Sequence, residues 1–435
     1  MKYIQQEGFL IKQIGENLMS AQEIVNKIDV NGNHSPFAVY LDEDVFELEQ
    51  ENLYRGKVWS YIGLDAEVPN AGDYKTTFVG DTPIVLTRAE DGSLNAWVNR
   101  CAHKGAVVCR ERHGHSEDGA FTCVYHQWAY DAKGDLKGVP FRRGMKGQGG
   151  YAKDFDMKDY GLQTLRVQTV AQMVFATFDS ETPDLEEFLG EKMCANIKRI
   201  MHKPLKIIGH TRQFMKGNWK AYAENSRDSY HGALLHLFYP TFGIYRQGQV
   251  SEGVTDKVGC HNYFNVSAPP KEDLDYKDYA DEANREMQGP HQLKDTRVLN
   301  FIPERDDNVA LSIQSLFPSV VLQQIQNTLA ARQVLPKSTN ETELVWTFFG
   351  YEDDDAAMDE HRLRNINLVG PAGLISMEDG EAVELVQNGV HRDGELCSFI
   401  EMGGNDVEDY TSPMGMDENA VRGFWKGYRA IMARD

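Results

Sequence analysis

The sequence reads Cys101-Ala102-His103-Lys104-Gly105 and, further on, Cys123-Val124-Tyr125-His126-Gln127-Trp128. Each stretch follows a strand-like run, so two hairpin loops could close on one metal centre. Zinc fingers take their cysteines and histidines as separate pairs, whereas each stretch here supplies one of each. Such mixing is typical of a [2Fe-2S] centre in which two cysteines hold one iron and two histidines hold the other. Scattered core cysteines and surface histidines are the alternative, but ligand spacing seldom repeats by chance.

These stretches, with the flanking Asn99-Arg100 and the later Tyr130–Pro140, resemble the Rieske domains of ring-hydroxylating oxygenases. The resemblance implies that Cys101 and Cys123 bind one iron and that His103 and His126 bind the other. The remaining cysteines have no histidine at ligand spacing and are interpreted as buried free thiols, since Cys packs as a small hydrophobe. They are Cys109, Cys194, Cys260 and Cys397.

Bulk composition excludes several classes of function. The chain has 435 residues and a formal net charge of −21, from 45 basic and 66 acidic side chains. No Lys/Arg cluster stands out, which argues against a nucleic-acid partner. No run of about 18 apolar residues occurs, and the N-terminus lacks the apolar region of a secretory signal, so we expect no membrane span and a cytoplasmic protein.

The elements predicted along the chain divide it into an arm and two domains. Residues 1–40 are interpreted as a polar, partly helical arm, and residues 41–175 as an all-β [2Fe-2S] domain with a flanking helix at Asp42–Tyr54. Its predicted strands are Trp59–Gly63, Thr77–Val79, Pro83–Arg88 and Ala96–Asn99, with a hairpin turn at Asp91-Gly92. Residues 176–435 are predicted to form an α+β domain of helix-grip type with an antiparallel sheet.

Within this second domain, helical spacing predicts helices over Leu185–Met201, Trp219–Leu237, Ala357–Leu368 and Ala420–Ala433. Residues 255–300 are charged and poorly periodic, so we expect a long surface excursion. Apolar runs predict strands at Val309–Phe317, at Val320–Leu335 with a break or bend, and at Glu343–Tyr351.

A second metal site is indicated by His231 and His236, which follow Glu224-Asn225-Ser226-Arg227-Asp228. Five residues apart, they lie about 140° apart around an ideal helix. A bend or break between them could bring both to one metal. Two histidines and a carboxylate make the facial triad that leaves positions open on Fe(II). Lone histidines on a helix are ordinarily hydrogen-bonded or exposed, and the conjunction with the first site favours iron.

The carboxylate is expected in Gly370–Glu381, which resembles the family segment that ends in an acidic pair whose second member binds iron. That resemblance implies Asp379, while Glu378 and Glu381 are rivals on chemistry alone. It also implies that Asp228 links His231 to a cluster-binding histidine of the neighbouring subunit. Asn225 is then a residue near the iron rather than a ligand.

The substrate is suggested by resemblance to the large subunits of terephthalate, salicylate, anthranilate and ortho-halobenzoate oxygenases, carried by Cys123–Trp128, Gly138–Gly150, Val321–Ser338 and Arg422–Tyr428. Those substrates all carry a carboxylate on an aromatic ring, which Arg binds with a bidentate fork. Arg332, in an otherwise apolar predicted strand, matches an Arg that contacts substrate carboxylate in terephthalate-type members. An internal ion pair is the structural alternative.

A second carboxylate-binding Arg of the terephthalate type would fall shortly before Arg422, and Ser412–Val421 contains none. The expected substrate is therefore an aromatic monocarboxylate, with anthranilate, salicylate, a halobenzoate and an aryl-acetate all open.

The resemblance implies the large (α) subunit of a terminal oxygenase that uses O₂, Fe²⁺, a [2Fe-2S] cluster and electrons from a separate reductase, directly or through a ferredoxin. We expect an α3β3 assembly with a small β subunit, or an α3 trimer. One alternative is a self-contained trimeric monooxygenase, such as a demethylase. Another, from a different class, is a Rieske electron carrier that never activates oxygen; the His231/His236/Asp379 set argues against it.

Overall fold

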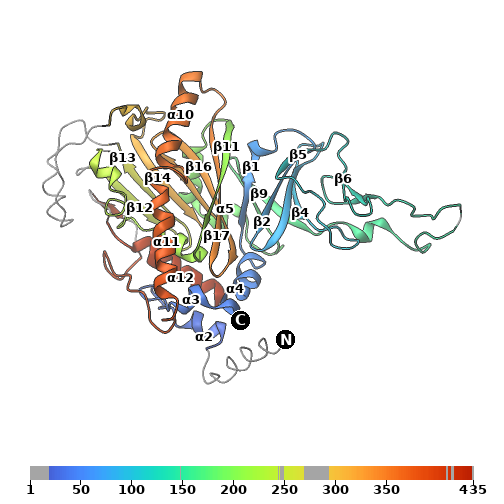
Figure 1. Cartoon of the computed structure of the whole chain (residues 1–435), viewed down its shortest axis with the longest axis horizontal. Coiled ribbons are helices and arrows are strands. Elements are labelled where there is room, and N and C mark those ends of the chain that lie inside the picture. The colour runs from blue at the N-terminus through green and yellow to red at the C-terminus, as the bar shows by residue number, and fades with distance from the viewer. Residues whose placement is uncertain are drawn as a thin grey trace, which may run out of the picture.

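The computed structural model describes residues 19–146, 148–242, 244, 249–268, 293–407, 410–412 and 416–433. These residues form two lobes, which lie side by side in Figure 1. The smaller lobe is built on a seven-stranded sheet and the larger on an eight-stranded sheet, and every pair of neighbouring strands is antiparallel. Among the described helices, none combines the length and apolarity that a bilayer span needs.

The smaller lobe carries one principal sheet and a small accessory sheet. The order of the principal sheet is β1 (Ser60–Leu64), β10 (Met173–Thr177), β9 (Thr164–Val170), β4 (Leu94–Val98), β3 (Thr82–Arg88), β2 (Asp73–Val79) and β5 (His113–His115). The accessory sheet contains β6 (Phe121–Thr122), β7 (Ala129–Tyr130) and β8 (Leu136–Gly138). The predicted hairpin turn is confirmed, because Gly92, at φ +81°, donates to the carbonyl of Ala89 between β3 and β4.

The larger lobe is a broad sheet with helices packed against both of its faces. Its strand order is β11 (Leu205–Met215), β17 (Glu341–Tyr351), β16 (Thr328–Ser338), β15 (Val320–Ile325), β14 (Val309–Leu316), β13 (Asn262–Ser267), β12 (Ser251–Thr255) and β18 (Tyr410–Ser412). The two long helices α10 (Ala356–Val369) and α11 (Ser376–Val390) lie across this sheet, as Figure 1 shows. The predicted α+β class with an antiparallel sheet is confirmed.

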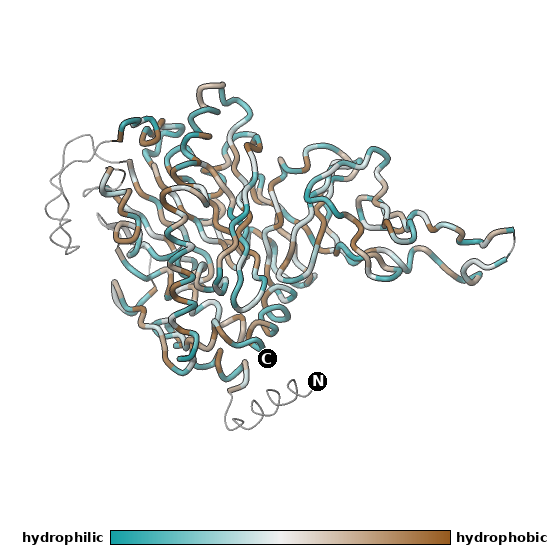
Figure 2. Tube along the Cα trace, in the orientation of Figure 1, coloured by the Kyte–Doolittle hydropathy of each residue, from teal (hydrophilic) through white to brown (hydrophobic). Residues whose placement is uncertain are grey.

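Further helices complete the larger lobe: α5 (Leu185–Leu189), α6 (Glu191–Ile200), α7 (Trp219–Asn225), α8 (Phe238–Thr241) and α12 (Asn419–Met432). Before β1 come α2 (Ala21–Asn26), α3 (Ala38–Leu41), α4 (Glu43–Glu49) and a π-helical turn over Gln50–Tyr54. Figure 2 shows hydrophobic and hydrophilic residues interspersed along the strands, and in the central strands β15 and β16 nearly every residue of both faces is buried.

The described part of the predicted arm packs into the molecule. Ile24 and Val25 of α2 are 2% and 0% exposed, and they belong to the core cluster that contains Trp425 of α12. The same cluster includes Ile62 and Val79 of the smaller lobe, so one continuous core joins the two lobes. Residues 1–18 lie outside the described residues.

Three predictions about local structure are wrong. The helix predicted over Trp219–Leu237 ends at Asn225, because the Asp228 side chain accepts from the amide of Tyr230 and competes with helical hydrogen bonds. The predicted excursion over 255–300 is wrong near its start, where Asn262–Ser267 form strand β13, which pairs with β12 and β14. Residues 269–292 of this stretch lie outside the described residues. Cys397 is exposed rather than buried.

Helix α11, which begins at Ser376 inside the acidic segment Gly370–Glu381, was not predicted from the sequence. Gly380 lies inside that helix, where a Cβ would come within 2.9 Å of the Gln213 side chain on β11. The glycine therefore allows a close approach of helix and strand, and it does not break the helix.

Candidate metal centres and substrate cavity

The two Cys/His loops of the smaller lobe share one backbone pattern. The amide of Gly105 donates to the carbonyl of Cys101 and that of Gln127 to the carbonyl of Cys123, both at 2.9 Å. Gly105 and Gln127 have φ values of +75° and +57°, so each loop turns through a left-handed residue. These local hydrogen bonds aim the side chains of the two loops at a common point.

The side chains at that point fit the two halves of a [2Fe-2S] cluster. Cys101 and Cys123 are 3% and 1% exposed, while the half-buried rings of His103 and His126 have their centroids 4.5 Å apart. Nδ1 of His103 is buried and has no hydrogen-bond partner in the described structure. A metal bond would satisfy this nitrogen, whose burial is otherwise unfavourable.

The environment of the thiols also suits a bound cation. Burial, together with the neighbouring Cys101 thiol, raises the pKa of the Cys123 thiol. The hydroxyl of Tyr130 lies 3.2 Å from Sγ of Cys101. Thiolates form in such a buried site when a positive metal compensates their charge.

The second predicted set also comes together. Oδ1 of Asp379 lies 3.4 Å from Nε2 of His231 and 3.1 Å from Nε2 of His236, and the three donor atoms lie within 4.8 Å of one another. Both histidines lie in the irregular connection between α7 and α8, and Asp379 lies in the first turn of α11. The break that ends α7 is therefore what allows the two rings to converge.

Two further carboxylates orient the two rings. Oδ2 of Asp228 lies 3.1 Å from Nδ1 of His231, and Oε2 of Glu378 lies 2.8 Å from Nδ1 of His236. A hydrogen bond at Nδ1 leaves the lone pair of Nε2 free for a metal. Sequence reasoning treated Glu378 as a rival ligand and missed this supporting position; its adjacency to Asp379 was the available signal. Glu381, the other rival, is exposed.

Asn225 contacts the same centre. Its Nδ2 donates to Oδ1 of Asp379 at 3.1 Å and lies 3.5 Å from Nε2 of His231. Burial raises the pKa of the Asp379 carboxyl, but the hydrogen bonds from His231 and His236 outweigh it and hold the pKa well below its ordinary value. Asp379 is therefore ionised, as a metal ligand must be.

A cavity of about 180 Å³ opens beside these three residues. Its lining combines His231, His236, Asp379 and Arg332 with apolar side chains from the sheet and its connections, among them Phe264, Val266, Leu299, Phe301, Ile313 and Ile325. A largely apolar cavity with a few converging polar groups is the usual form of a small-molecule site.

Arg332 lies on β16 and is 5% exposed. It donates to the hydroxyl of Tyr222 at 2.9 Å and to the amide oxygen of Gln323, and its guanidinium stacks 4.5 Å from the Trp346 ring centroid. Within the described ranges it forms no ion pair with an acidic side chain, and its Nε has no hydrogen-bond partner. The structural alternative of an internal ion pair thus has no support in these residues.

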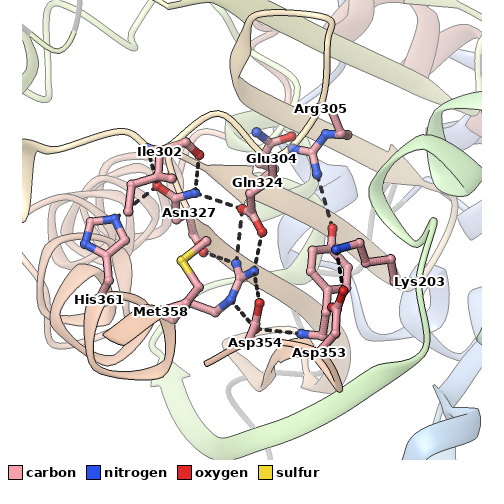
Figure 3. A network of polar contacts seen from close by, with 12 residues as sticks. Lys203, Ile302, Glu304, Arg305, Gln324, Asn327, Asp353, Asp354, Met358 and His361 are labelled. Atoms are coloured by element: carbon pink, nitrogen blue, oxygen red, sulfur yellow. Dashed lines mark hydrogen bonds and ion pairs between the residues drawn. The ribbon is translucent and has the colours of Figure 1, made fainter. Parts of the chain in front are cut away.

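A polar network anchors the outer wall of the cavity. Figure 3 shows Asn327, in the turn between β15 and β16, bonded to the segment that contains Ile302 and Glu304 and to His361 of α10. Arg362, also of α10, pairs with Glu304 and donates to the carbonyl of Asn327 at 2.7 Å. The cavity residues Leu299, Phe301, Ile325 and Gln326 flank this network.

Comparisons with known proteins agree with this geometry. Residues 58–156 match the Rieske [2Fe-2S] domain, and residues 195–434 match the ring-hydroxylating α subunit (catalytic domain). The chain is 46% identical over 403 residues to the anthranilate 1,2-dioxygenase large subunit of Burkholderia cepacia, covering 92% of this chain and 94% of that protein. It is 44% identical over 402 residues to subunit alpha 2 of the terephthalate 1,2-dioxygenase terminal oxygenase component of Comamonas sp. The match covers 92% of this chain and 95% of that protein.

A naphthalene 1,2-dioxygenase structure from Rhodococcus sp. superposes with a TM-score of 0.78 at 19% identity, covering 95% of this chain and 98% of that one, and shows the same fold. The chain belongs to the ring-hydroxylating oxygenase α-subunit family. It is an oxidoreductase with a Rieske [2Fe-2S] cluster and a mononuclear iron.

Proposed function

We propose that this chain hydroxylates an aromatic monocarboxylate of the ortho-substituted benzoate type, with electrons from a separate reductase. The observation that carries this proposal is Arg332, a buried cation in the wall of the cavity next to the His231/His236/Asp379 set. The relatives named for anthranilate, terephthalate and salicylate support a carboxylate on the ring.

The hydrogen-bonding state of Arg332 favours an anionic substrate group. Nε of Arg332 and Nε2 of the adjacent Gln323 are both buried donors without a partner among the described residues. An unsatisfied buried donor costs about 1–3 kcal/mol, and an unpaired buried charge costs more. A substrate carboxylate would offset these costs and hold the ring at a set distance from the iron.

The second cationic residue of the cavity favours one carboxylate over two. Arg227 also lines the cavity, but its two Nη groups already donate to the carbonyls of Ala223 and Cys260. Burial lowers the pKa of Arg227 to about 10, so it stays charged at neutral pH. Nε of Arg227, like that of Arg332, has no partner among the described residues, but both of its Nη groups are held by backbone carbonyls, so we assign the substrate carboxylate to Arg332.

The remaining residues are assigned roles that their positions support. Cys101, His103, Cys123 and His126 would hold the cluster, and His231, His236 and Asp379 the mononuclear iron. When bound, the cluster supplies single electrons and the iron supplies open positions for O₂. Asp228 fixes His231 through Nδ1 and would reach a cluster histidine of a neighbouring subunit, which implies an α3 core with or without a β subunit.

We also propose the division of the chain into residues 41–175 for the cluster domain and 176–435 for the catalytic domain. A reductase, directly or through a ferredoxin, would deliver electrons, and the reaction would take place in the cytoplasm.

The test is Arg332→Gln assayed for product under ¹⁸O₂ with a panel of ortho-substituted benzoates. We expect kcat/KM to fall by an amount equivalent to about 2–5 kcal/mol of lost transition-state stabilisation. Because the ring is misplaced, the variant should also consume O₂ without forming hydroxylated product. The matching neutral amides should be affected far less. Unchanged activity on every carboxylate, with both metal centres retained, would contradict the proposal.

A further inference from the structure

A second cluster of two histidines and a carboxylate lies where the two lobes meet. Glu67 lies in the short 3₁₀ turn after β1, and His113 lies on β5, both in the smaller lobe. His210 lies on β11, the edge strand of the larger sheet. Side chains from three segments far apart in the sequence thus meet at one place, away from the cavity that contains His231, His236 and Asp379.

The donor atoms of this cluster converge on one oxygen. Oε1 of Glu67 lies 2.8 Å from Nε2 of His210 and 3.3 Å from Nε2 of His113. The three atoms lie within 4.8 Å of one another, as they do in the His231/His236/Asp379 set. Ligands bound tetrahedrally to Zn²⁺ at about 2.1 Å lie about 3.4 Å apart, so a small movement of the rings would admit an ion.

Burial leaves one side of the cluster open. The Glu67 side chain is 0% exposed, whereas those of His113 and His210 are 38% and 30% exposed. The carboxylate is therefore fixed within the protein while the two imidazoles face solvent. This arrangement gives an ion an entry path and leaves a fourth position for water.

The other oxygen of Glu67 is already engaged. Oε2 accepts from Nζ of Lys75 at 2.7 Å and from the amide of Leu64 at 2.8 Å. Lys75 therefore positions the carboxylate and also opposes a nearby cation. The next cations along the two strands, Arg112 and Arg212, are both paired with Glu343.

These charges select among cations. With a single carboxylate oxygen and flanking positive charges, the cluster offers little to Ca²⁺ or Mg²⁺, which require several oxygen ligands. Two imidazoles and one carboxylate suit a borderline divalent ion. We propose that Glu67, His113 and His210 bind Zn²⁺ or a similar transition-metal ion, which joins the two lobes independently of the catalytic iron.

The test measures zinc in the iron-loaded holoenzyme. Wild type, the His113→Asn/His210→Asn double variant and the control His115→Asn are each equilibrated with one equivalent of Zn²⁺, desalted, and analysed for zinc and iron. His115 is a matched control because it lies on the same strand as His113 and, among the described residues, its ring bonds only to Asp73. We expect about one zinc per chain to be retained in wild type and in the control. The double variant should retain at least about tenfold less zinc at equal iron content.

Two further readouts make the result decisive. Zn²⁺ should raise the unfolding temperature of wild type and His115→Asn but not that of the double variant, because an ion that binds only the folded state stabilises it. Lys75→Met should bind Zn²⁺ more tightly than wild type. Equal zinc retention and equal thermal shifts in wild type and the double variant would overturn the proposal, as would an equal loss of zinc in His115→Asn.

Discussion

The two metal centres of this chain are held in different ways. Backbone hydrogen bonds within two short loops, which end in Gly105 and Gln127, aim the cluster ligands. Side-chain carboxylates on different elements aim the catalytic ligands, with Asp228 behind His231 and Glu378 behind His236. The first centre is thus specified locally, and the second only after the larger lobe has folded.

This difference has consequences for mutation and pH. A loop held by its backbone tolerates changes in side chains that are not ligands. A centre held by buried carboxylates is sensitive to the charge of residues that never touch the metal. Replacing one carboxylate behind or at the catalytic iron should therefore leave the cluster intact.

The largest effect is expected from Asp379→Ala. Loss of the carboxylate leaves two histidines, too few to keep iron in the facial arrangement, so hydroxylation should fall below detection. The absorbance of the cluster and its reduction by dithionite should be unchanged, because its ligands lie in the other lobe. Retention of activity, or simultaneous loss of the cluster, would show that the two centres are not separate.

The next largest effect is expected from Asp228→Asn, which keeps the shape of the side chain and removes its charge. Both metal centres should remain, while steady-state turnover falls by about 100-fold, the upper end of what such supporting carboxylates contribute. Stopped-flow oxidation of the pre-reduced cluster in the presence of substrate and O₂ measures the affected step directly. A wild-type rate would remove Asp228 from the electron path.

A smaller effect is expected from Glu378→Gln. The amide still bonds to Nδ1 of His236 but no longer supports it with a charge, so affinity for Fe²⁺ should weaken by about 10–100-fold. Competition with a chelator measures this affinity. Glu381→Gln, on the exposed side of the same helix, is the matched control and should leave iron affinity unchanged. Equal effects of the two variants would contradict the role of Glu378.

The last effect concerns stability rather than activity. Burial raises the pKa of Glu224, which precedes Asn225 on α7, from 4.5 to about 7, against the hydrogen bonds from Tyr40 and Trp425. The folded state therefore binds this proton more tightly, and stability falls as pH rises from about 4.5 to about 7. The total is about 3 kcal/mol at about 1.36 kcal/mol per pKa unit.

Glu224→Gln should remove that fall. Between pH 4.5 and pH 8, its free energy of unfolding should therefore decrease less than that of wild type. Urea unfolding at both pH values measures the difference, with the exposed Glu381→Gln as control. Parallel pH profiles of wild type and Glu224→Gln would show that Glu224 titrates normally.

The same distinction explains what could be predicted from the sequence. The convergence of the two Cys/His loops could be predicted, because a few consecutive residues determine the conformation of each loop. Asp379 lies well over a hundred residues from His231, and no spacing rule joins them, so only family resemblance selected it. The helix around Asp379 was not predicted, because glycine is a poor helix former and nothing near Gly380 in the sequence shows that it faces the side chain of Gln213 on β11.

Arg332 was predicted from resemblance alone, and its unpaired state could not be predicted. An internal ion pair and a substrate-facing guanidinium look identical in sequence. They differ only in which neighbours the sheet brings together, here Gln323 and Tyr222 instead of an acid.

The central claim, that one chain carries two separate iron centres, is tested most directly by counting iron and acid-labile sulfide in the purified protein and in its Asp379→Ala variant. We expect three irons and two sulfides per chain in wild type, and two irons and two sulfides in the variant, since a [2Fe-2S] cluster and one mononuclear iron are held by different residues. Two irons in wild type, unchanged on loss of Asp379, or zinc in place of iron and sulfide, would contradict it.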